Sequence, residues 1–295
     1  MKRVLNFGSV NIDHVYFVEH FVRPGETIHC REYRRFAGGK GLNQSIALAQ
    51  AGAAVYHAGK ISVADPWLKT LMAEKGVNTQ FVDTVDGPSG HAVIQVNTEG
   101  ENAIVIVGGA NRLFDASDFD RIVGAFGSND WLLVQNEVNA VAQIIRAAKT
   151  RGLTVACNPA PMAEQVLDYP LELIDLLIVN EAEAQALSGD SAPDAVYRAF
   201  SQRCPNTALL LTTGSRGASY FSAQLQFFQP AKRVDVVDST GAGDTTVGFF
   251  LAELIRTNDP KTALAFATTA AALSVTRHGA AGSIPSRLEV ESLAN

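Results

Sequence analysis

An alternation of apolar runs and helical patterns between residues 130 and 276 constrains the fold of this chain more than any other feature. Short apolar runs typical of buried strands lie at 131–134, 153–156, 174–179 and 208–212. Patterns with helical spacing lie at 138–149, 181–187, 244–256 and 261–276. This βαβ order predicts an α/β fold with a mainly parallel central sheet and helices on both faces. Ligand-binding loops are expected at the carboxyl ends of the strands.

The first third of the chain has a different pattern, in which short β-prone segments are separated by Pro-Gly, Glu-Gly and Gly-Gly turns. We therefore expect a single α/β domain over residues 1–295 with a discontinuous β lid formed by about 13–36 and 88–107. Such an appendage can cover a binding site or pair with a second subunit.

Composition argues against several classes of function. The 295 residues are 47% hydrophobic and carry a formal net charge of −6 without a dense block of Lys or Arg, so neither nucleic acid nor a membrane surface is an expected partner. The longest apolar-rich stretch, 263–275, is too short to span a bilayer, and the first residues lack a signal-peptide pattern. Three widely spaced cysteines indicate reduced thiols, and the histidines form no His-Glu-x-x-His pair. We expect a cytoplasmic enzyme without transition-metal chemistry.

The segment Asp238-Ser-Thr-Gly-Ala-Gly-Asp244 places two carboxylates around a glycine turn that leads into a helical pattern. The amides of Gly241, Ala242 and Gly243 at the start of a helix can bind an anion. Asp244 beside that anion can accept a proton from an attacking hydroxyl, as the transfer of a terminal phosphoryl group requires. A plain helix cap is the alternative interpretation.

A second glycine turn, Gly38-Gly-Lys-Gly-Leu-Asn-Gln44, precedes a small-residue helix expected at 45–51. Backbone can approach a ligand closely at such a turn, although its spacing is not that of a P-loop. A packing turn is an equally good interpretation.

Asn11 and Asp13 lie two residues apart on an expected extended segment, so their side chains share one face and can hold sugar hydroxyls. A turn in which Asp13 bonds its own backbone is the alternative. The same passage has no G-x-G-x-x-G pattern, which disfavours a dinucleotide-binding dehydrogenase.

Two further turns follow expected strands. Asn180 and Glu183 begin a helix, where Asn180 can cap the helix and Glu183 can hold magnesium through water. Taken alone, this pair is more often a simple capping arrangement. The segment 212–217 ends a buried strand with a glycine turn, which suits the vicinity of a nucleotide.

Taken together, these motifs resemble those of the ribokinase-like carbohydrate kinase family, also called the phosphofructokinase-B type, and the similarity runs nearly end to end. The segments that carry it are Gly8-Ser-Val-Asn-Ile-Asp13, Pro24-Gly-Glu-Thr27, Gly38-Gly-Lys-Gly-Leu-Asn43, Asn158-Pro-Ala-Pro161, Asn180-Glu-Ala-Glu183, Thr213-Gly-Ser-Arg-Gly217, Asp238-Ser-Thr-Gly-Ala-Gly-Asp244 and Val275-Thr-Arg-His-Gly279.

The resemblance implies an ATP-dependent sugar kinase in which Asp244 is the base and Gly241, Ala242 and Gly243 form the anion hole. The residues implied to hold the sugar are Asn11, Asp13, Gly39, Lys40, Asn43, Glu137 and Asp244. Those implied to serve ATP and its Mg²⁺ are Asn180, Glu183, Thr212, Gly214, Ser215 and Thr268. K⁺, which orders the turn in similar proteins, is implied at Asp238, Thr240, Ser274, Arg277, Gly279 and Ser283.

Three positions depart from the family pattern. Leu42 replaces a small residue, 61–66 replaces a Gly-x-Asp-x-x-Gly turn, and Thr268 stands where histidine is common. The first two leave the sugar less constrained, and the third leaves the choice of nucleoside triphosphate less constrained.

The resemblance implies transfer to the primary hydroxyl of a pentose, with D-ribose at O5 the favoured acceptor. Deoxyribose, fructose or another keto-sugar, or a nucleoside, are the alternatives. A catalytically silent sugar sensor is a remote alternative, against which the retention of Asp244, Asn180 and Glu183 counts. The family habit also implies a homodimer formed through the β lid.

Overall fold

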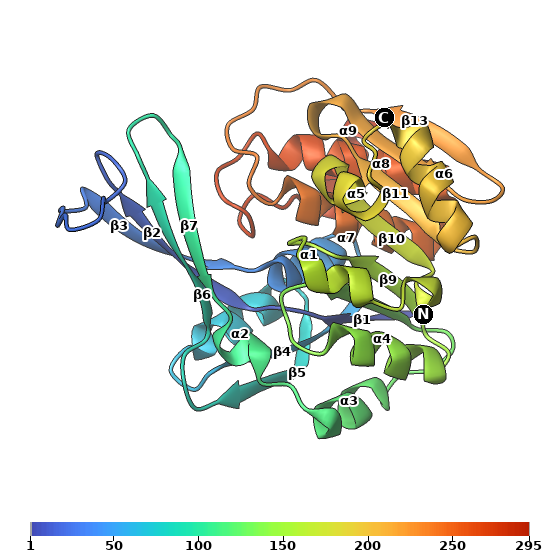
Figure 1. Ribbon diagram of the computed structural model, residues 1–295, viewed down its shortest axis with the longest axis horizontal. Coiled ribbons are helices and arrows are strands. Elements are labelled where there is room, and N and C mark those ends of the chain that lie inside the picture. The colour runs from blue at the N-terminus through green and yellow to red at the C-terminus, as the bar shows by residue number, and fades with distance from the viewer. Residues whose placement is uncertain (1, 295) are drawn as a thin grey trace.

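The computed structural model describes residues 2–294, which are built around a nine-stranded sheet in the order β13-β12-β11-β10-β9-β8-β1-β4-β5 (Figure 1). The strands are β1 (Arg3–Phe7), β4 (Ala54–Ser62), β5 (Asn78–Val85), β8 (Trp131–Gln135), β9 (Thr154–Asn158), β10 (Leu176–Asn180), β11 (Ala208–Thr212), β12 (Gly217–Phe221) and β13 (Gln226–Pro230). The strands from β11 to β5 pair in parallel, and the edge strands β12 and β13 are antiparallel. The mainly parallel α/β sheet predicted from the sequence is therefore confirmed.

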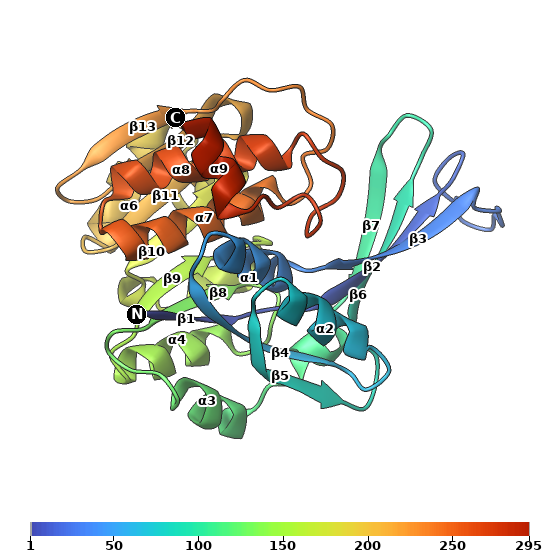
Figure 2. The ribbon, with the colours of Figure 1, turned by 180° about the vertical axis from the view of Figure 1, so that it is seen from behind.

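Helices cover both faces of this sheet (Figures 1 and 2). One face packs under α1 (Lys40–Gln50), α2 (Pro66–Glu74), α7 (Ala242–Thr257), α8 (Pro260–Ser274) and α9 (Arg287–Ala294). The other packs under α3 (Ala116–Val123), α4 (Val141–Thr150), α5 (Glu181–Ser188) and α6 (Pro193–Arg203). Alternate residues of each strand enter the two cores, as for Val4 and Leu5 of β1.

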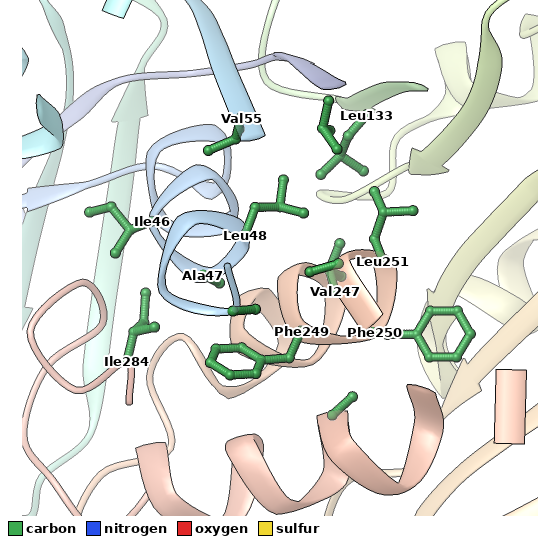
Figure 3. Packing of buried hydrophobic residues seen from close by; sticks show 14 of the residues in the cluster. Ile46, Ala47, Leu48, Val55, Leu133, Val247, Phe249, Phe250, Leu251 and Ile284 are labelled. Atoms are coloured by element: carbon green, nitrogen blue, oxygen red, sulfur yellow. The ribbon is translucent and has the colours of Figure 1, made fainter. Parts of the chain in front are cut away.

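The helices α1 and α7 lie unusually close to each other. A Cβ atom added to Gly248 of α7 would lie 2.4 Å from the Cβ of Ala47 in α1, so the two backbones meet where neither helix has a larger side chain. Figure 3 shows Ala47 and Leu48 facing Val247 and Phe249 across this contact. The starts of both helices are thereby held on one side of the sheet.

A second, four-stranded sheet projects from the α/β body (Figures 1 and 2). Its strands are β2 (Asn11–Phe17), β3 (Glu32–Gly38), β6 (Gly90–Val96) and β7 (Asn102–Val107), in the order β3-β2-β6-β7. Two segments far apart in the sequence meet because β2 pairs in parallel with β6. The small separate β-sheet that we expected is present.

The expected helix at 45–51 is wrong at its start, because α1 begins at Lys40. The amide of Leu42 donates to the carbonyl of Ser9 at 2.8 Å, and that of Asn43 donates to Gly39 at 3.0 Å, so the segment expected to be a turn is already helical. Similarly, α4 begins at Val141 and not at 138. Among residues 2–294, no helix combines the length and the apolar character that crossing a membrane requires.

Candidate active site

A row of polar side chains crosses five neighbouring strands of the large sheet. The row consists of His57 on β4, Asn6 on β1, Gln135 on β8, Asn158 on β9 and Asn180 on β10. In each strand the residue two positions earlier belongs to the core beneath α1 and α7, so the row faces those helices. The sheet thus presents hydrogen-bonding groups to the starts of both helices.

Asp244 lies in the first turn of α7 and is 8% exposed. Its Oδ1 accepts a hydrogen bond from Nε2 of Gln44 at 2.9 Å, and its Oδ2 accepts one from Nδ2 of Asn43 at 3.0 Å. Burial raises the pKa of this carboxyl group, while the charge of Lys40 and the two amide donors oppose the rise. A buried carboxylate with a raised pKa and a fixed orientation is suited to accept a proton.

The turn before Asp244 leaves amides available for an anion. Gly241 precedes the helix with φ +78°, and the amides of Gly243 and Asp244 have no acceptor among the described residues. The amide of Ala242, which we expected in the anion hole, donates to the carbonyl of Ser239 at 3.2 Å in this structure. The start of α7 therefore carries unpaired donors at the positive end of the helix dipole.

The start of α1 faces the same space but has its amides paired. Gly39 precedes the helix with φ +92°. The amide of Lys40 donates to Oε2 of Glu137 at 2.8 Å, and that of Gly41 donates to Oγ of Ser9 at 3.2 Å. Ser9 Oγ also donates to Glu137 Oε2, whose pKa is raised by burial. These contacts hold Glu137 and Lys40 beside Asp244.

Asp13 on β2 lies directly over the backbone of Gly38, since a Cβ atom there would lie 2.2 Å from its Oδ2. Burial and the charge of Glu137 raise the pKa of Asp13 to about 6. No donor to its carboxylate is found in the part of the chain described, so this group is free to accept from a ligand hydroxyl. Oδ1 of Asn11 instead accepts from Nδ2 of Asn111 at 2.7 Å and supports the β2–β6 junction.

A cavity joins many of the predicted residues. It is lined by Lys40, Asn158, Ala160, Ile178, Val179, Asn180, Glu183, Thr212, Gly241, Gly243, Asp244 and Val247. The cavity thus places the proposed base and the glycine turn of α7 next to the start of α5.

Asn180 and Glu183 form a capping box at α5, because Asn180 Oδ1 accepts from the Glu183 amide and Glu183 Oε2 accepts from the Asn180 amide, both at 2.9 Å. The capping interpretation is therefore confirmed, and both residues also line the cavity. Oε1 of Glu183 has no protein donor in the described chain, and burial raises the pKa of the group. One carboxylate oxygen thus remains for a hydrated cation.

Three predicted nucleotide residues do not line this cavity. Gly214 and Ser215 lie in an exposed 3₁₀ turn after β11. Thr268 is buried in α8, and its hydroxyl donates to the carbonyl of Ala265 at 3.0 Å.

The residues expected to bind K⁺ lie in two loops that Asp238 joins. Its Oδ1 accepts from the amide of Thr240 at 2.9 Å, and its Oδ2 accepts from the amide of Gly279 at 2.8 Å. The Arg277 guanidinium pairs with Glu289 at 2.6 Å, so only the carbonyl oxygen of Arg277 is suited to a cation. The hydroxyls of Ser274 and Ser283 donate to the carbonyls of Ala271 and Ala280.

Sequence reasoning identified Asn43 but missed the other side chains that support Asp244. Gln44 was noted only as part of a glycine turn, and Gln135 and Asn6 were not identified. The signal of Asn6 and Gln135 was a polar residue at or next to the end of an apolar strand, in phase with the buried positions before it.

The two sheets and the cavity at the start of α7 form the architecture of a phosphotransferase with an alcohol group as acceptor, and the family match and the relatives identify the chain as one. Residues 1–287 match the family described as pfkB family carbohydrate kinase, and the chain belongs to this family.

Solved and curated relatives cover nearly the whole chain. The ribokinase of Staphylococcus aureus is 34% identical, with 98% of each chain covered, and that of Haemophilus influenzae is 35% identical, covering 98% of this chain and 97% of the relative. The structure of Arabidopsis thaliana ribokinase complexed with ribose and ATP superposes with a TM-score of 0.89 at 30% identity, covering 100% of this chain and 99% of that one.

Proposed function

We propose that this protein is an ATP-dependent kinase that transfers the γ-phosphoryl group to O5 of D-ribose. The observation that carries the proposal is the position of Asp244, which lines the same cavity as Lys40 and as Gly243 of the α7 start, where two amides are unpaired. The similarity to ribokinases, one of them solved with ribose and ATP, supports the acceptor and the donor. The same similarity favours ribose over deoxyribose, a keto-sugar or a nucleoside.

In this mechanism, Asp13, Asn43 and Lys40 orient the sugar while the amides at the start of α7 stabilise charge on the transferred phosphoryl group. Asp244 accepts the proton of the attacking hydroxyl, and the phosphoryl group passes directly to the sugar oxygen. Glu137 fixes the start of α1 through the Lys40 amide. A positioned base of this kind contributes about 10²- to 10⁴-fold to the rate.

The cations are part of the proposal. Mg²⁺ bound with ATP would neutralise phosphate charge, and Glu183 would hold it through water with its remaining oxygen. K⁺ would lie by the loops that Asp238 joins, held by oxygens of Asp238 and Thr240 and by main-chain oxygens near Arg277 and Gly279. In that position the ion would order the turn that precedes Asp244.

We further propose that the small sheet acts as a lid and pairs with a second copy of the chain. Its edge strand β7 exposes Ile104, Val105, Ile106 and Val107, which are 39–64% exposed. An apolar edge strand of this kind is a natural pairing surface. Light scattering on the purified protein is expected to give twice the mass of the 31.4 kDa chain, and a monomer at micromolar concentration would contradict this proposal.

The function is tested by measuring ADP formation with ribose, deoxyribose, fructose and a nucleoside, each with and without K⁺. Ribose is expected to give the highest kcat/KM, and K⁺ to raise it. Preference for another acceptor would correct the sugar. Sugar binding without ADP formation from any phosphoryl donor would establish a sensor in place of a kinase.

A further inference from the structure

We infer that Gln44 and Gln135 are positioning residues for phosphoryl transfer, because a chain of buried, hydrogen-bonded amides points the NH₂ group of Gln44 at Asp244. The inference rests on the proposed function, in which Asp244 is the base. It concerns side chains deep in the core, beyond the residues that line the acceptor site.

This chain of hydrogen-bonded amides begins at the carboxylate of Asp244. Nε2 of Gln44 donates to Asp244 Oδ1 and to Asn158 Oδ1, both at 2.9 Å. Gln44 is fully buried, so no water competes for these bonds. A flipped amide would place its oxygen against the carboxylate and would remove a hydrogen bond that lowers the pKa of Asp244.

Gln135 prevents that flip. Its Nε2 donates to Oε1 of Gln44 at 2.7 Å and to Oδ1 of Asn6 at 2.9 Å. With its oxygen held by this donor, Gln44 can offer only its NH₂ group to Asp244. Gln135 is itself fully buried on β8, where Asn6 of the neighbouring strand β1 fixes it in turn.

A main-chain carbonyl sets the direction of the whole chain. Nδ2 of Asn6 donates to the carbonyl of Gly41 and to Oγ of Ser45, both at 2.8 Å. A carbonyl can only accept, so the amide of Asn6 is fixed, and the orientations of Gln135 and Gln44 follow from it. Asn6 therefore presents its oxygen to Gln135, Gln135 donates from one NH₂ group to both Asn6 and Gln44, and Gln44 is left with its NH₂ group for Asp244.

The far end of the chain is electrically neutral. Ser45 Oγ bonds Nδ1 of His57 at 2.8 Å, and burial lowers the pKa of His57 to about 3. No charge enters the chain near neutral pH. The charged groups that face Asp244 come from other elements and are Lys40 of α1, Glu137 after β8 and Glu183 of α5.

An isosteric series tests the inference. Gln44→Met and Gln135→Met keep the volume of the side chain but cannot donate. Gln44→Met is expected to lower kcat about tenfold at pH 7 and to move the acid limb of the kcat–pH profile up by about one unit, because Asp244 loses a donor to its charged form. KM for sugar and ATP should stay within about threefold. Gln50→Met, on the same helix with its amide bonded to Lys75, is the matched control and should leave the profile unchanged.

Gln135→Met is expected to shift the acid limb in the same direction by a smaller amount. The double variant should match Gln44→Met, because Gln135 acts only through Gln44. If the reductions in kcat caused by the two substitutions multiplied in the double variant, the inferred chain of hydrogen-bonded amides would be contradicted. Thermal unfolding checks each variant, and Gln135→Met, which removes no contact with Asp244, decides the question if Gln44→Met does not fold.

If the acid limb of the kcat–pH profile is unchanged in Gln44→Met, whatever the value of kcat, the hydrogen-bonded amides have only a structural role and the inference is overturned. Asp244→Asn separates this failure from a failure of the proposed function. If Asp244→Asn loses turnover while Gln44→Met keeps the native pH profile, the inference about the glutamines is wrong and the proposed function stands. Full turnover in Asp244→Asn would instead remove the base, and with it both proposals.

Discussion

The helices α1 and α7 begin in closely similar ways but treat their first amides differently. Both follow a glycine with positive φ, +92° at Gly39 and +78° at Gly241, and neither has a side-chain cap. At α1, Ser9 and Glu137 accept the hydrogen bonds of the first amides. At α7, the amides of Gly243 and Asp244 have no acceptor among residues 2–294.

This difference shows how one motif can serve two purposes. A glycine turn before a helix is an anion site only if the protein leaves its amides unpaired. The first amides of α1 donate to Glu137 and Ser9, whereas two first amides of α7 stay available to a ligand. The hydrogen-bond partner of each amide therefore distinguishes an anion site from a packing turn or helix cap, which the sequence left open.

The sharpest test of the comparison is Asp244→Asn at the α7 start. We expect kcat to fall by about 10²- to 10⁴-fold with little change in nucleotide affinity, because the amide cannot accept the proton. Steady-state kinetics and calorimetric binding of ATP measure the two effects. Asp259→Asn, at the exposed cap of α8, is the control and should retain normal turnover. Retention of strong activity in Asp244→Asn would refute the role of the base.

Asp13→Asn probes the acid that lies against the backbone before α1. Because the folded pKa of Asp13 is raised to about 6 from 3.8, its ionised form destabilises the fold as pH rises through this interval. The variant should be more stable by at most ~3 kcal/mol at pH 8, and by roughly half of that at pH 5. Denaturant unfolding at the two pH values measures this.

The same substitution should raise KM for the sugar, since the amide loses one acceptor for its hydroxyls. Asp86→Asn, at an exposed turn, provides the matched control. An equal stability change for Asp13→Asn at both pH values would show that the carboxylate is not held in an unfavourable environment.

Gly39→Ala and Gly241→Ala compare the two turns directly. Each alanine must adopt a left-handed backbone conformation, which costs about 1–2 kcal/mol. At Gly39 the new Cβ would lie 2.9 Å from Oγ of Ser9, and at Gly241 it would lie 2.9 Å from the Cβ of Ala280. We expect the first variant to raise the sugar KM and the second to lower kcat. If both variants changed sugar KM and kcat in the same way, the two helix starts would not differ in function as proposed.

Ser9→Ala gives the smallest expected effect. It removes the acceptor of the Gly41 amide and a donor to Glu137, which should cost about 1 kcal/mol of stability. Sugar KM should rise modestly while ATP affinity stays unchanged. A change in ATP affinity without a change in sugar KM would show that this turn serves the nucleotide instead.

The sequence was sufficient for the α/β class, because apolar runs and helical spacing report local burial. It predicted the strand 208–212 with the bounds of β11. It failed at the start of α1, where Gly41 suggested a turn. That glycine lies inside the helix, where a side chain would not fit because a Cβ atom would be 2.3 Å from the amide nitrogen of Ser9. Such a close approach depends on tertiary packing, which local patterns do not report.

The site was predictable to a similar extent. Asp244 and the pair Asn180 and Glu183 were identified because their motifs are contiguous. Gln44 and Gln135 are 91 positions apart, and their bond exists only because β8 lies next to β1 beneath α1. Hydrogen bonds between distant segments have no local signature, so the support of the base emerges only from the fold.

The missing methyl group at Gly248 has a consequence for how this enzyme can be altered. Because α1 and α7 touch at Gly248 and Ala47, the separation of the two helices is set in the hydrocarbon interior, one helical turn along α7 from Asp244. A side chain added at this contact would push the two helices apart. The start of α1, proposed to hold the sugar, would then lie farther from the start of α7, proposed to hold the phosphate. Substitutions that fill the contact between Gly248 and Ala47 to stabilise the fold would therefore lower turnover, although no residue of the proposed active site would change.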